Sequence, residues 1–142
     1  DSARYQLLTK AFEIARDMFP FGTGFATFGS YYSGVYYSSV YAAYGLSNIN
    51  GLRIGASQFI SDSFWPMILG QSGYFGLLSY VFAVTMLLKA IQRIRKVENS
   101  YYAAAMSGIC YLIIVSMAES AFVHPVAVPI AMMIGAFLGK CE

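Results

Sequence analysis

The stretch "SDSFWPMILGQSGYFGLLSYVFAVTMLLKAIQRIRK", residues 61–96, decides the fold class. Its central part, residues 64–88, contains no charged side chain, and about 20 apolar residues are enough to cross the hydrocarbon core of a bilayer. Trp65 suits a membrane–water interface, and Pro66 falls in a first helical turn, where its missing N–H is tolerated. The stretch is therefore predicted to form a membrane-spanning helix.

The charges that follow this helix predict its orientation. Lys89, Arg93, Arg95 and Lys96 lie close together at its end, and loops rich in lysine and arginine face the cytoplasm. Everything before Ser63 is then expected on the external side. A solvated helix face would carry the same charges and is compatible with this topology.

Two further apolar segments follow and are predicted to span about residues 101–119 and 124–139. The first has no charge before Glu119. The second is short for a full crossing, so it either begins near His124 or crosses only partly. We therefore expect about three membrane-embedded helices in a membrane domain at residues 64–142.

Residues 1–63 have a different pattern and are predicted to form an external helix and a loop rich in tyrosine and glycine. Segment 2–19 has the periodicity of an amphipathic helix, and Pro20 ends it. Its charges make it a poor membrane span, so an interfacial or packed helix is expected. Its apolar face is predicted to consist of Tyr5, Leu8, Phe12, Ala15 and Phe19. The tyrosines of the loop suit a membrane boundary or would stack on sugar rings.

The composition supports the membrane class. Of 142 residues, 58% are hydrophobic and only 11% charged, whereas about a quarter are charged in soluble domains. A net charge of +2 provides no basic surface for nucleic acid. One histidine and two distant cysteines do not make a transition-metal site. The first residues read as the interior of a helix, so we expect a fragment of a larger membrane protein.

Asp62 and the external arginines are the candidate site residues. A charged residue at the edge of a membrane span needs a partner or a function. The carboxylate of Asp62 could act as a general base towards a sugar hydroxyl, and the planar guanidinium of Arg4 or Arg53 would match the oxygens of a diphosphate. Asp62 could also be the N-cap of a helix that starts at Ser63 or Phe64. Capping and catalysis do not exclude each other.

The small residues of the span and the single histidine also allow more than one interpretation. Gly73 and Gly76, together with Ser72 and Ser79, place small side chains on one side of the helix. This pattern favours close helix packing. His124 either belongs to a structural turn or acts at the external surface.

Four stretches, taken in order, carry a resemblance to a known family. They are "SARYQLLTKAFEIARDMFPFGTGFATFGS" (2–30), "YSSVYAAYGL" (37–46), "SDSFWPMILGQSGYFGLLSY" (61–80) and the tail "AESAFVHPVAVPIAMMIGAFLG" (118–139). In this order they resemble the C-terminal half of the O-antigen ligase and polysaccharide polymerase family. Members of that family are bacterial membrane proteins with several spans and a large external loop between late helices.

The most specific part of the resemblance is the junction between loop and helix. In the ligases this junction has a histidine, a small polar residue, nine residues and a glycine, with another glycine soon after. Asp62, Ser63, Gly73 and Gly76 fit that frame, with Asp62 in the place of the ligase histidine. Arg4 matches the family's arginine at the start of the external helix. The acid makes the chain more similar to the polymerases, in which this position varies.

The resemblance implies an activity and a set of site residues. It implies a metal-independent, inverting glycosyltransferase that polymerises undecaprenyl-diphosphate-linked oligosaccharide repeat units into O-antigen, capsule or exopolysaccharide. Arg4 would hold the donor diphosphate, and Asp62 would orient or deprotonate the acceptor hydroxyl. The further residues predicted to bind substrate are Arg53, Tyr41, Tyr44 and Ser63.

The resemblance also implies a location and partners. The protein would be a multi-pass protein of the bacterial inner (plasma) membrane, with residues 1–63 outside. Its partners would be a lipid-linked glycan donor and acceptor, the lipid bilayer and a chain-length regulator protein, without a cofactor. Two alternatives stay open: an O-antigen ligase that transfers a glycan to lipid A-core, and a non-catalytic flippase or assembly module. In the second, Arg4 and Asp62 would be structural.

Overall fold

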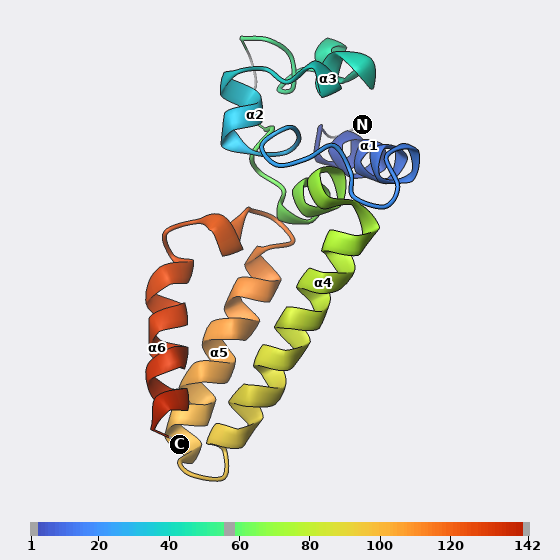
Figure 1. Ribbon diagram of the computed structural model, residues 1–142. Helices are drawn as coiled ribbons and strands as arrows, with labels where there is room; N and C mark the ends of the chain where they lie inside the picture. Colours follow the sequence, from blue (N-terminus) through green and yellow to red (C-terminus); the bar gives the residue numbers. More distant parts are fainter. Residues whose placement is uncertain (1–2, 56–58, 141–142) are drawn as a thin grey trace.

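The computed structural model describes residues 3–55 and 59–140, and every long element in these ranges is an α-helix. The long helices are α1 (Ala3–Asp17), α4 (Phe64–Ile94), α5 (Asn99–Val115) and α6 (Ala127–Gly139). Helices α4, α5 and α6 run alongside one another, and α1 lies across one end of this bundle (Figure 1). The prediction of an all-α fold is confirmed for the described residues.

Four short helices lie in the connections. Ser30 and Ser38 cap α2 and α3, because each side chain accepts a hydrogen bond from a backbone N–H in the first turn. Both helices lie on the side of α1 that faces away from the bundle (Figure 1). The bounds of the short helices are α2 Tyr31–Val35, α3 Ser39–Ala43, η1 Leu46–Asn48 and η2 Ala121–Val123.

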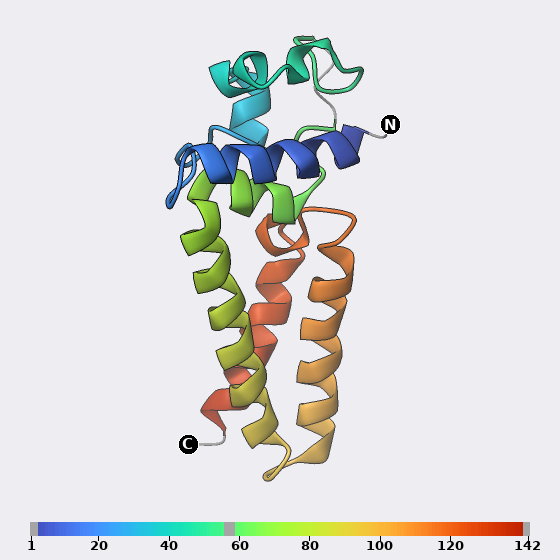
Figure 2. The same cartoon turned by 90° about the vertical axis from the view of Figure 1, so that its right-hand side faces the viewer.

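Helix α1 packs on the first part of α4 and crosses the end of the bundle (Figure 2). Its packed face differs from the apolar face predicted from the sequence. Four of the predicted five, Tyr5, Leu8, Phe12 and Phe19, are exposed, and only Ala15 is buried. The buried residues of α1 are Leu7, Ala11, Ile14 and Ala15. Two alanines on this face allow a close approach to α4, while the bulky aromatic face points outward.

Gly73 interrupts α4. Its φ of 64° and ψ of −164° are non-helical, and a backbone in this region is essentially restricted to glycine. Residues 64–72 therefore lie below α1, whereas residues 74–94 turn and run along the bundle (Figure 2). The prediction of one continuous span over 64–88 was wrong in this respect, because sequence hydropathy does not register a change of helix direction.

The loop after α1 forms backbone hydrogen bonds with α4 at its interruption. The N–H of Thr23 donates to the carbonyl of Gly70 at 3.0 Å, and the N–H of Gly24 donates to the carbonyl of Gln71 at 2.9 Å. These carbonyls lost their own helical partners at the break, and a buried carbonyl without a partner is costly. The loop therefore stabilises the interrupted helix by replacing its missing hydrogen bonds.

The backbones of the loop and the helix meet too closely for side chains at two glycines. A Cβ added to Gly22 would lie 2.5 Å from the carbonyl oxygen of Gly70, and a Cβ on Gly73 would overlap the carbonyl oxygen of Pro20. Gly22 of the loop and Gly73 of α4 therefore lie on the two sides of one close backbone contact. Close packing was predicted for Gly73, and its partner is this loop.

The side chain of Gln71 adds a second connection between the same segments. Its Nε2 donates to the carbonyl of Phe28, and its Oε1 accepts from the N–H of Ala26 at 3.1 Å. Phe28 is buried in a core that also contains residues of α1, α3 and α4. Gln71 thus fixes the loop against α4 with both ends of its amide.

A second core holds the bundle together. It contains residues of α4, α5 and α6, and it is formed by Ile91, Ile94, Ala105, Ile109 and Ile134. Helix α5 ends at Val115, before the predicted limit of 119, and α6 begins at Ala127, after the predicted start at 124. Both helices are apolar but shorter than α4.

Within the described residues, α4 is long and apolar enough to cross a membrane. Residues 74–94 alone extend roughly 30 Å at about 1.5 Å per residue, close to the thickness of the hydrocarbon core. Only 6% of the most apolar 18-residue window of α4 is buried inside the molecule. This exposure supports contact with lipid, because the core helix of a soluble protein would be mostly buried.

We expect Gly73→Ala to destabilise the protein by about 2–4 kcal/mol, since alanine is strained in this conformation and its Cβ would displace the loop. The measurement is the free energy of unfolding of the protein in detergent micelles. Gly135→Ala is the matched control, because Gly135 lies in α6 with open space around its Cβ position. A Gly73→Ala variant as stable as the wild type would contradict the role given to the interruption.

Candidate functional site

The structure brings together the two residues that were predicted to be catalytic. Arg4 lies in the first turn of α1, and Asp62 lies in the turn before α4. The Nη2 of Arg4 and the Oδ2 of Asp62 are 3.6 Å apart, with 49% of the Arg4 side chain and 31% of the Asp62 side chain exposed. A pair this exposed contributes at most about 1 kcal/mol to stability. Both groups therefore remain accessible to a ligand.

Asp62 is not the N-cap of α4. The N-cap position is occupied by Ser63, whose side chain makes no capping hydrogen bond. The described N–H groups of the first turn do not donate to Asp62 either, and Arg4 is its ionic partner. The capping interpretation of this acid is therefore wrong. Asp62 nevertheless lies directly before the N-terminus of α4.

A pocket of about 250 Å³ opens beside this ion pair. Arg4 and Ser63 form its polar edge, while most of its remaining surface is apolar. Trp65 lines the wall and donates from Nε1 to the Oγ of Ser116 at 3.1 Å. The other lining residues are Tyr5, Leu8, Phe64, Pro66, Ser116 and Met117. We call this the Arg4 pocket. A cationic edge beside an apolar wall suits an amphiphile with an anionic head group.

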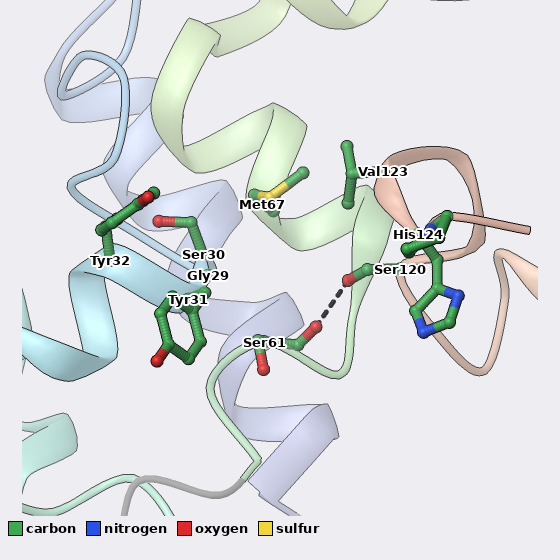
Figure 3. Close-up of a pocket in the computed structure, with 10 residues that line it drawn as sticks. Gly29, Ser30, Tyr31, Tyr32, Ser61, Met67, Ser120, Val123 and His124 are labelled. Carbon is green, nitrogen blue, oxygen red and sulfur yellow. Dashed lines mark hydrogen bonds between the residues drawn. The ribbon is translucent and has the colours of Figure 1, made fainter. Parts of the chain in front are cut away.

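A second pocket of about 420 Å³ lies on the other side of the same turn, and its lining side chains are shown in Figure 3. It is formed by the start of α2, by the turn before α4 and by the turn after α5. The hydroxyl of Ser120 donates to the carbonyl of Ser61 at 2.5 Å and joins two of these segments (Figure 3). We call this the Tyr31 pocket. Ser61 lines the Tyr31 pocket and Ser63 lines the Arg4 pocket, whereas Asp62, between them in the sequence, lines neither.

Tyr41, predicted to bind substrate, is a core residue. Its ring has no exposed surface, and a ring without exposed surface cannot touch a glycan in this conformation. Its hydroxyl accepts from the N–H of Gly29 at 2.8 Å and shares a 2.7 Å hydrogen bond with Ser33. Burial raises the pKa of Tyr41, and the hydrogen bonds from Ser33 and Gly29 oppose part of this rise. In the folded protein the phenol of Tyr41 therefore stays neutral above pH 10. Its contribution to stability is lost as the pH rises through the raised pKa.

Tyr44 and Arg53 line neither of the two pockets beside Asp62. The hydroxyl of Tyr44 donates to the Oδ2 of Asp17 at 3.4 Å. Its pKa is raised, first by burial and then by the negative charge of Asp17. Arg53 is exposed in the loop before residue 55. Of the six predicted site residues, the structure brings together Arg4, Asp62 and Ser63.

The turn after α5 contributes to both pockets, and its role was missed in the sequence. Ser116 and Met117 reach the Arg4 pocket, while Ser120 and His124 reach the Tyr31 pocket. The sequence signal was weak, because this turn is far from Asp62 along the chain. His124 was considered as an external residue, but nothing local indicated which segments it would face. The described residues contain no group of three histidine, cysteine or acidic side chains that could hold a metal ion.

Comparison with known proteins identifies no relative of this chain. The chain matches no protein-family model, no curated protein and no solved structure at a significant level. The function must therefore be argued from the site itself, and the family resemblance stays a prediction.

Tyr41→Phe tests the packing role of this tyrosine. The substitution removes the acceptor of Gly29 N–H and the partner of Ser33, so we expect a loss of about 1–3 kcal/mol in the free energy of unfolding. Tyr36→Phe is the matched control, since the Tyr36 side chain is 80% exposed, and it should change stability by less than about 0.5 kcal/mol. Equal effects of the two substitutions would show that the hydroxyl of Tyr41 has no structural role.

Proposed function

We propose that this chain belongs to a membrane glycosyltransferase that polymerises undecaprenyl-diphosphate-linked oligosaccharide repeat units into a surface polysaccharide. The observation that carries the proposal is the accessible Arg4–Asp62 pair, 3.6 Å apart, in which Arg4 lines a pocket. Both side chains are exposed enough to exchange this contact for a ligand, the guanidinium for a leaving group and the carboxylate for a nucleophile. The resemblance to the polymerases implies that these same two residues act on the donor diphosphate and on the acceptor hydroxyl.

The Arg4 pocket suits the donor. The guanidinium would pair with diphosphate oxygens, for which its planar donors are well shaped. The apolar wall of Tyr5, Leu8 and Met117 would contact the first part of the lipid chain. The exposed side chain of Met117 lies just beyond the end of α5, so such a chain could continue along the bundle towards the lipid phase.

Asp62 would act on the acceptor. The acceptor hydroxyl oxygen attacks the anomeric carbon of the donor sugar, on the face opposite the diphosphate. The new carbon–oxygen bond forms as the bond to the diphosphate oxygen breaks, which inverts the anomeric configuration. The hydroxyl proton moves to the carboxylate of Asp62. The electron pair leaves with the diphosphate, and Arg4 stabilises its additional negative charge.

The proposal includes a multi-pass topology in the bacterial inner (plasma) membrane. Helix α4 is the span with the strongest support. Helices α5 and α6 would return and cross again as shorter apolar helices packed on α4. The basic residues after α4 would face the cytoplasm. Arg4, Asp62 and both pockets would then lie at the external surface, where lipid-linked repeat units are joined.

Asp62→Asn and Arg4→Ala test the proposed chemistry. We expect each to lower polymer synthesis about 100-fold or more, since the first removes the general base and the second removes the charge that stabilises the leaving group. The measurement is polymer formed in membrane vesicles supplied with lipid-linked repeat units. Arg16→Ala is the matched control, because Arg16 lies on the same helix and is exposed. If the Asp62→Asn and Arg4→Ala variants both made full-length polymer at normal protein level, Asp62 and Arg4 would have only a non-catalytic role.

Cysteine labelling tests the topology separately. In a background with Cys110→Ala and Cys141→Ala, a cysteine at Asn48 should react with a membrane-impermeant maleimide added to intact spheroplasts. A cysteine at Gln92 should react only after the membrane is opened. Both positions are exposed, so that accessibility depends on the side of the membrane. The reverse labelling pattern would place the pockets in the cytoplasm and contradict the external site.

A further inference from the structure

The Tyr31 pocket has no role in the chemistry described above, although it is the larger of the two pockets beside Asp62. Its volume of about 420 Å³ falls in the usual range of small-molecule sites, about 300–1,000 Å³. Three segments that are distant in the sequence converge on it (Figure 3). Its walls come from the first turn of α2 and from the turn after α5, and Met67 comes from α4.

The wall formed by α2 is held rigidly. Ser30 and Ser33 form a reciprocal capping box at the start of this helix, with each side chain bonded to the other residue's backbone N–H. A Cβ on Gly29 would lie 2.9 Å from the Cα of Met67, so the loop touches the backbone of α4 directly. Tyr31 and Tyr32 are therefore presented from a fixed position. Both rings stay mostly exposed, at 69% and 61%.

The chemistry of the lining selects a class of ligand. The two tyrosine rings pack edge to face with centroids 5.6 Å apart and offer aromatic surface and phenol hydroxyls. Serine hydroxyls and the imidazole of His124 supply the remaining side-chain hydrogen-bonding groups. The lining contains no lysine, arginine or carboxylate. A phosphate would need cationic partners. Most of the lining surface is apolar and the hydroxyls of Ser30 and Ser120 already have partners, but a lipid chain would leave the imidazole of His124 without one. A neutral sugar ring has apolar C–H faces and many hydroxyls, and it matches both parts of this surface.

The location of the pocket connects it to the proposed reaction. Ser61 lines it and Ser63 lines the Arg4 pocket, so the two pockets adjoin the same turn, in which the carboxylate of Asp62 pairs with Arg4 and lines neither pocket. A sugar in the Tyr31 pocket would lie on the side of Asp62 away from the donor diphosphate. We propose that the Tyr31 pocket binds a neutral sugar residue of the acceptor glycan, stacked on Tyr31 and hydrogen-bonded by His124. This assignment rests on the proposed function, because only a transfer reaction gives the chain an acceptor.

The test is direct saccharide binding by the protein purified in detergent micelles. The probe is lipid-free oligosaccharide released by mild acid hydrolysis from the surface polysaccharide of the cell that makes this protein. Saturation-transfer NMR and titration should detect binding to the wild type. Tyr31→Ala should weaken it about three- to tenfold, which corresponds to the loss of one ring contact. Tyr31→Phe should stay within about twofold, because the ring is kept.

Two further variants separate this proposal from the proposed function. Tyr36→Ala is the matched control, since Tyr36 is exposed at the end of α2 and does not line the pocket. It should bind like the wild type. Asp62→Asn should also bind the oligosaccharide normally while losing polymer synthesis. If Asp62→Asn kept polymer synthesis, the proposed reaction would fail even if the pocket still bound sugar.

Three results would overturn the pocket assignment. The first is a wild-type protein that does not bind the released oligosaccharide. The second is a Tyr31→Ala variant that binds as tightly as the wild type. The third is displacement of the oligosaccharide by inorganic diphosphate, which would make this pocket the anion site. Circular dichroism of each variant checks that α2 and the bundle remain folded.

Discussion

The interruption of α4 at Gly73 is the constraint on which the rest of the structure depends. An unbroken helix would carry residues 64–72 straight on from the bundle and leave α1 without a surface to pack on. With the break, the first part of α4 lies across the end of the bundle and supports α1. The carbonyls freed at the break bind the loop at residues 22–24. One change of backbone direction therefore places the N-terminus of α1 above the start of α4, where Arg4 meets Asp62.

This arrangement explains why two charged residues lie at the boundary of an apolar bundle. Arg4 and Asp62 come from separate segments and meet in the open, at a distance that contributes little to stability. Each of the two adjoining pockets has its own chemistry: a cationic edge on an apolar wall, and a neutral surface of aromatic rings and hydroxyls. The turn after α5 lines both pockets and links the turn before α4 to the bundle through the Ser120–Ser61 hydrogen bond.

In the tyrosine-rich region, some tyrosine side chains are buried in the core and others are exposed at the surface. Tyr41 is buried with its hydroxyl bonded to Gly29 and Ser33. Tyr31 and Tyr32, about ten residues earlier, stay exposed in a pocket. Composition alone offered the same two explanations for every tyrosine, namely a boundary residue or a sugar-stacking residue. Only the packing of α2 and α3 against the loop separates them, because a hydroxyl that finds two internal partners can be buried.

The sequence by itself determined the helical class, the apolar helix beginning at Phe64 and the choice of Arg4 and Asp62 as candidates, the last through a family resemblance. These features are local, since they follow from hydropathy, periodicity and short motifs. Tertiary structure alone decided that α4 breaks at Gly73, that an adjacent face of α1 packs, and that the turn after α5 completes the pockets. The physical reason is that each of these depends on backbone hydrogen bonds and close contacts between residues roughly 45–60 positions apart. Hydropathy and periodicity describe one segment at a time and carry no information about such partners.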